Sequence, residues 1–141
     1  MPDVLDVAAY ILQEHGPMTG MKLQKLVYYS QAWSIVWDDD ELFPEEIEAW
    51  KNGPVVRELW DAHRGQFRVS EIQNGDADRL DADEMETVDL VLKFYGDKSA
   101  QWLSDLTHME DPWKDAWESG PNSVITKEAL AEYYSSIKPP K

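Results

Sequence analysis

The chain has 141 residues, 43% of them hydrophobic, and a formal net charge of −15. This length and composition fit one folded domain and exclude a wholly disordered chain. The charge argues against nucleic-acid binding, because phosphate backbones repel an acidic chain, and it would attract a basic partner. The absence of cysteine excludes disulfides and cysteine-based zinc sites. Without an apolar run of membrane-spanning length or a signal-peptide pattern, we expect a cytoplasmic protein.

Two helices are expected at the start of the chain. Asp3 is a suitable cap for the first helix, which Gly16 ends. Thr19 is a suitable cap for the second, in which apolar residues recur at helical spacing, forming one stripe as far as Trp37. The acidic run 38–41 then meets the negative end of the helix dipole, so we expect it to be solvated.

A small sheet is expected in the middle of the chain. Residues 47–52 alternate in polarity, which predicts a short strand ended by Gly53. Pro54 suits the first turn of a third helix, which carries His63. Residues 67–72 are expected to form a second strand, antiparallel to the first.

Capping residues mark the starts of four further helices: Asp81 with Glu84, Asp97 or Ser99, Asp111 with Pro112, and Thr126. The expected fold is therefore mainly α, a single compact domain of about six or seven helices with a small two- or three-stranded antiparallel sheet. We assign residues 1–138 to this domain and 139–141 to a short tail.

Few groups are candidates for catalysis. His15 and His63 lie on predicted helices and are expected to be structural. His108 lies with Glu110 and Asp111 between two helices, where a metal site, a catalytic base, a partner contact and a structural hydrogen bond are all compatible with the pattern. We favour the structural role, and we predict no catalytic residue, no bound metal and no cofactor.

Polar residues at the start of the second helix require partners. Lys22, Gln24, Lys25 and Gln31 are expected to hydrogen-bond to carboxylates elsewhere in the fold or to contact a partner. The aspartates of 76–83 lack the spacing, central glycine and final glutamate of an EF-hand, so a calcium site is not predicted.

Three segments together resemble one family: MKLQKLVYYSQAW, then LFPEEIEAWKNGPVVRELW, then LTHMEDPWKDAW. They are similar to the Panacea domain, which includes SocA-like antitoxins and phage-associated proteins, and the resemblance extends from the first helix to about Tyr134. It implies a compact helical fold and an antitoxin role in a bacterial or phage toxin–antitoxin pair. The residues that match the family pattern are Lys22, Leu23, Gln24, Lys25, Tyr28, Gln31, Ala49, Trp50, Gly53, Pro54, Val55, His108, Pro112 and Trp113.

The resemblance leads to a functional prediction. We expect a non-enzymatic antitoxin that neutralises a cognate toxin, encoded next to it, by direct protein–protein binding. One alternative is a proteolytic adaptor that delivers the toxin to the ClpXP protease, as the SocA branch of the family implies; another is a small hydrolase or metal enzyme centred on His108. Trp50, Trp60 and Trp117 are candidate toxin contacts, because each lies beside polar positions near the end of an element, with core packing as the alternative.

Overall fold

The computed structural model describes residues 1–139, and within them the fold is mainly helical, as predicted. The helices are α1 (Val4–His15), α2 (Gly20–Trp37), α3 (Arg57–His63), α4 (Ala82–Tyr95), α5 (Ala100–His108), α6 (Asp111–Glu118) and α7 (Lys127–Ser136). The short strands are β1 (Met18–Thr19), β2 (Ile47–Trp50), β3 (Gly53–Val55), β4 (Arg68–Val69) and β5 (Val124–Ile125), and one 3-10 turn, η1, spans Ala77–Arg79. The expected tail of 139–141 lies, apart from its first residue, outside the described residues.

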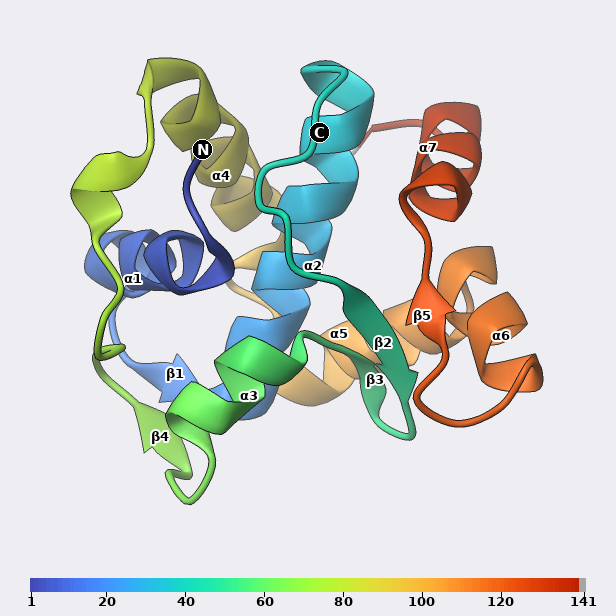
Figure 1. Ribbon diagram of the computed structural model, residues 1–141, viewed down its shortest axis with the longest axis horizontal. Helices are drawn as coiled ribbons and strands as arrows, with labels where there is room; N and C mark the ends of the chain where they lie inside the picture. Colours follow the sequence, from blue (N-terminus) through green and yellow to red (C-terminus); the bar gives the residue numbers. More distant parts are fainter. Residues whose placement is uncertain (140–141) are drawn as a thin grey trace.

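Helix α2 is the central element of the fold. The remaining helices surround it, with α1 and α4 on one side and α7 on the other (Figure 1). Leu23, Tyr29 and Trp33 are fully enclosed, and polar residues such as Gln24 are buried as well. The predicted apolar stripe is buried from Leu23 to Trp33, but the positions outside it are mostly buried as well, because α2 packs against helices on several sides.

Side-chain caps begin most helices where the sequence predicted them. Asp3 and Asp81 each form a capping box, and Thr19, Ser99 and Thr126 each accept a backbone N–H at the start of a helix. These caps satisfy N–H groups that have no partner inside the helix, which explains why the sequence marks these boundaries well.

The start of α6 differs from its prediction by one residue. Glu110, and not Asp111, occupies the N-cap position, and its side chain makes no capping hydrogen bond. Asp111 lies in the first turn with Pro112. The Glu110 side chain is buried instead, so it is directed to partners in the core rather than to the end of its own helix.

Two antiparallel sheets form, in place of the single sheet expected. In the first, the strand order is β3-β2-β5, and Pro54 pairs with Ala49 in β3 rather than beginning α3. An edge strand tolerates proline, which has no N–H to donate. In the second sheet, β4 pairs with β1, with Val69 opposite Met18. The predicted pairing of 67–72 with β2 was wrong because β3 and β5 occupy both sides of β2.

Candidate interaction site

Two buried glutamines fix backbone segments to α2. The Gln24 side chain accepts the Val56 N–H at 2.9 Å, donates to the Val56 carbonyl at 3.3 Å, and lies 3.1 Å from the His63 ring nitrogen. Two helical turns later, Gln31 accepts the Leu42 N–H at 2.6 Å and the Phe43 N–H at 3.4 Å, and it donates to the Phe43 carbonyl at 2.8 Å. The expected carboxylate partners were wrong, because buried backbone groups take these amides.

Lys25 is buried at the N-terminal end of the same helix, with 1% of its surface exposed. Its Nζ donates to the Pro54 carbonyl at 3.2 Å, and within residues 1–139 no carboxylate forms a salt bridge with it. The side chain passes directly beneath Gly53, whose φ of 121° and missing Cβ leave room for it. Burial lowers the pKa of Lys25 to about 7, so near neutral pH both protonation states are populated.

Two tryptophans form the outer wall of a pocket above this lysine. The rings of Trp50 and Trp60 lie 5.6 Å apart, and both side chains are half-buried. The Arg57 guanidinium lies 5.2 Å from the centre of the Trp50 ring, and that of Arg64 lies 5.4 Å from the Trp60 ring.

We name this cavity the Trp50–Trp60 pocket. Its volume is about 240 Å³, and the residues that line it are Met21, Gln24, Lys25, Trp50, Lys51, Asn52, Val55, Trp60 and His63. Burial lowers the pKa of His63, and the nearby Lys25 charge lowers it further, so this ring is neutral at pH 7. The pocket therefore combines aromatic walls with hydrogen-bond donors and no carboxylate among its lining residues.

The structure does not bring His108 and Glu110 into one catalytic arrangement. The His108 Nε2 lies 3.0 Å from the Lys51 carbonyl, a backbone partner that matches the structural role predicted for it. Oε1 of Glu110 accepts hydrogen bonds from the hydroxyls of Tyr29 at 2.7 Å and Tyr134 at 2.8 Å. Within residues 1–139, no three His, Asp or Glu side chains come close enough together to hold a metal ion.

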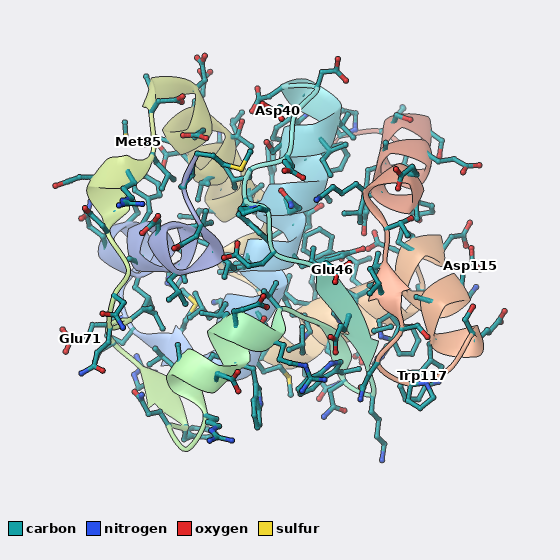
Figure 2. All side chains as sticks on the ribbon, viewed as in Figure 1. Asp40, Glu46, Glu71, Met85, Asp115 and Trp117 are labelled. Carbon is teal, nitrogen blue, oxygen red and sulfur yellow. The ribbon has the colours of Figure 1, made fainter. Side chains whose placement is uncertain are left out.

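Trp117 lies apart from the other two candidate contacts. It stacks on Trp113 of the same helix with ring centres 5.4 Å apart, and it lies at the outer edge of α6 (Figure 2). It does not line the Trp50–Trp60 pocket. The three tryptophans proposed as contacts therefore occupy two separate positions, one shared by Trp50 and Trp60 and one held by Trp117.

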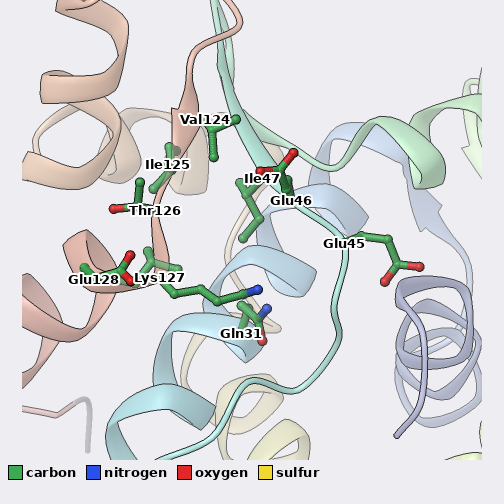
Figure 3. Close-up of a pocket in the computed structure, with 10 residues that line it drawn as sticks. Gln31, Glu45, Glu46, Ile47, Val124, Ile125, Thr126, Lys127 and Glu128 are labelled. Carbon is green, nitrogen blue, oxygen red and sulfur yellow. The ribbon is translucent and has the colours of Figure 1, made fainter.

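A second cavity of about 240 Å³ lies between β2, β5 and the start of α7 (Figure 3). Several of its polar side chains have partners within the protein. Glu45 turns toward α1, where it accepts the Val4 N–H at 3.0 Å, and Lys127 pairs with Glu41. Because the cavity lacks the paired tryptophans and the buried lysine of the Trp50–Trp60 pocket, it is a weaker candidate for a partner site.

No helix among the described residues combines the length and apolar character that crossing a bilayer requires.

The sequence analysis did not predict two features of the interior: the isolated Lys25 and the Glu110 carboxylate shared by two tyrosines. A signal for the first was present, since Lys25 lies between Leu23 and the apolar pair Leu26 and Val27.

The match to known proteins covers this region. The family model for the SocA-like antitoxin, Panacea domain, matches residues 23–114, which include every lining residue of the Trp50–Trp60 pocket except Met21. No curated protein and no solved structure matches the chain. Most residues of the family pattern are buried, whereas three are partly exposed: Lys22, Trp50 and His108. The chain belongs to the SocA-like antitoxin family of Panacea domain proteins.

Proposed function

We propose that this protein is the antitoxin of a bacterial or phage toxin–antitoxin pair and that it neutralises a toxin encoded next to it by direct binding. Family membership supports the antitoxin role and implies a cognate toxin as the partner. Neutralisation by binding requires a surface that can be desolvated against another protein, and the Trp50–Trp60 pocket is the feature that carries this part of the proposal.

The composition of the pocket supports it as a docking surface. Tryptophan and arginine are the residues most enriched among those that dominate binding energy at protein interfaces. Here Trp50 and Trp60 are half-buried, and Arg57 and Arg64 lie over their rings. Their positions are held by the rigid scaffold, because Gln24 fixes the backbone of Val56 immediately before α3. A pre-formed aromatic surface costs little ordering entropy when a partner binds.

A growth assay tests the proposal. The product of the adjacent reading frame should stop growth when expressed alone, and co-expression of this protein should restore growth. Trp60→Ala should abolish the rescue and weaken the affinity by about 30-fold, equivalent to about 2 kcal/mol, as expected for loss of a central aromatic contact. Affinity is measured by calorimetric titration of the purified toxin.

Trp102→Ala provides a matched control. Trp102 is 45% exposed and has the Lys98 ammonium 5.1 Å from its ring, yet it does not line the pocket. This variant should bind the toxin within about threefold of the unmodified protein. Equal losses of toxin affinity for Trp60→Ala and Trp102→Ala would contradict the assigned surface.

Inhibition of the toxin by purified components, without any protease, separates direct neutralisation from delivery to ClpXP.

A further inference from the structure

We propose that the Trp50–Trp60 pocket receives an aspartate or glutamate side chain of the toxin, whose carboxylate accepts hydrogen bonds from Nζ of Lys25. This inference rests on the proposed function and deepens it, because it specifies the chemistry by which the toxin is recognised.

Lys25 has donors without partners. A protonated lysine carries three N–H groups, and the hydrogen bond to the Pro54 carbonyl at 3.2 Å uses one of them. A buried cation is stable only when it is paired and hydrogen-bonded. Within residues 1–139, the salt bridges involve other side chains and leave Lys25 without an anionic partner. An anion that entered the pocket would therefore pair with the protonated form of Lys25, which has no such partner in the free protein.

The surroundings of the pocket favour a negatively charged occupant. The chain has 28 acidic residues, yet the lining contains none of them and includes a second cation, Lys51. The nearest acidic side chain on the strand, Glu48, accepts from the Trp50 indole at 2.9 Å and pairs with Arg57 at 3.0 Å. It is therefore engaged outside the pocket and does not balance Lys25.

The size and walls of the pocket favour a side chain over a small-molecule ligand. Its volume of about 240 Å³ is below the roughly 300–1,000 Å³ of typical small-molecule sites. Trp50 and Trp60 would cover the methylene groups of an acidic side chain and exclude water from the ion pair. A charge-assisted hydrogen bond is stronger in such a low-dielectric site than in water.

Binding of a carboxylate would change the protonation of Lys25. Above pH 7, the free protein holds this amine mainly in the neutral form, because burial lowers its pKa to about 7. An adjacent carboxylate stabilises the ammonium, so the complex would take up a proton. The other titratable groups that face the pocket are His63 of α3 and Lys51 of the β2–β3 turn, and the neighbours contributed by β3 and α5 are Pro54 and Thr107.

The test is a calorimetric titration with the purified toxin at about pH 8.5, in two buffers of different ionisation enthalpy. The unmodified protein should take up about one proton per toxin bound. Lys25→Met should lose this uptake and bind at least about ten-fold more weakly, because it leaves the toxin carboxylate buried without a partner. Lys25→Gln serves as a second variant should the methionine variant fold poorly. Lys114→Met, at an exposed lysine that does not line the pocket, is the matched control, and it should retain the uptake.

Substitution of the acidic residues of the toxin, Asp→Asn and Glu→Gln, identifies the occupant. One of these changes should weaken binding by the unmodified protein but have no further effect on binding by Lys25→Met. If Trp60→Ala weakens binding while Lys25→Met changes neither the affinity nor the proton uptake, the inference fails and the proposed function stands. Competition by inorganic phosphate at Lys25 with no coupled toxin carboxylate would overturn the assignment to an acidic side chain. If no adjacent-frame product binds, the proposed function falls, and this inference falls with it.

Discussion

The two ends of helix α2 differ in charge and in how their polar groups are held. At the N-terminal end, Gln24 and Lys25 are buried beneath the Trp50–Trp60 pocket, whose lining carries no carboxylate. At the C-terminal end, a shallow cavity is lined almost entirely by acidic residues of the loop after α2 and of the start of α4: Asp38, Asp40, Glu41, Asp81, Asp83 and Glu84. The net charge of −15 is therefore unevenly distributed over the molecule.

This difference shows why net charge alone identifies a partner poorly. The overall charge indicates a protein that attracts basic molecules over long distances, which affects solubility and association rate. The lining of the aromatic pocket contains lysines and no carboxylate, and the carboxylate beside it, Glu48, is paired with Arg57. Charge at the centre of an interface determines specificity, whereas the charge of the remaining surface mainly steers the encounter.

The largest expected effect comes from the two buried glutamines of α2, each of which binds a backbone segment packed against the helix. Gln24→Ala leaves the buried Val56 N–H without a partner, although the Val56 carbonyl still accepts from the Trp60 N–H, so it should lower the free energy of unfolding by about 2 kcal/mol. Gln31→Ala leaves the N–H groups of Leu42 and Phe43 and the Phe43 carbonyl without their partner, so its loss should be about 3 kcal/mol. Urea denaturation measures this loss. Only Gln24→Ala should also reduce toxin affinity per folded molecule. Equal effects of both variants on affinity would remove the functional distinction between the ends.

The next effect is on the pH dependence of stability. The pKa of Lys25 is about 7 in the folded protein and 10.5 in the unfolded chain, so in this window the unfolded chain binds the additional proton. Stability should therefore rise with pH, by about 2 kcal/mol between pH 7 and about 9. Lys25→Met should show a flatter profile by that amount in denaturant titrations at each pH. If the free energy of unfolding changed equally with pH in both proteins, Lys25 would have to be stabilised as a cation by a charged partner in the folded protein.

The smallest effect is expected at the acidic end. Asp83 is exposed and lies beside other carboxylates, so Asp83→Asn removes a repulsion that solvent already screens. The free energy of unfolding should change by less than about 0.5 kcal/mol, and the toxin dissociation rate should be unchanged. Stopped-flow binding and thermal melts measure the two quantities. A faster dissociation rate would show that the toxin also contacts the acidic end of α2, so the two ends would differ less in function.

The local signals in the sequence predicted the helices well, because caps act within a few residues. Asp3, Thr19, Asp81 and Thr126 all begin helices where the sequence indicated. The pairing of strands is not local. Strands β3 and β5 pair with both edges of β2, so residues 68–69 pair with β1 instead. The spacing of residues in the sequence does not show which strands will pair.

The polar interior of the candidate site was harder to predict for a related reason. The apolar neighbours of Lys25 in sequence indicate its burial, but the partners of Lys25 and Gln24 follow from the central place of α2 and lie far away in sequence. The sequence analysis named Trp50, Trp60 and Trp117 as candidate contacts, each on its own position near the end of an element. The structure brings the first two to one pocket and leaves Trp117 on α6.

The carboxylate of Glu110 has a consequence for the C-terminal helix. One oxygen atom, Oε1, receives the hydroxyl of Tyr29 from α2 and that of Tyr134 from α7, while Tyr28 donates in turn to Tyr134. Three helices thus meet at a single acceptor. Trimming the chain before residue 127 would remove the Tyr134 hydroxyl from this acceptor and uncover the buried Tyr28 and Tyr29 beside it, so the loss of a peripheral segment would disturb the middle of the central helix.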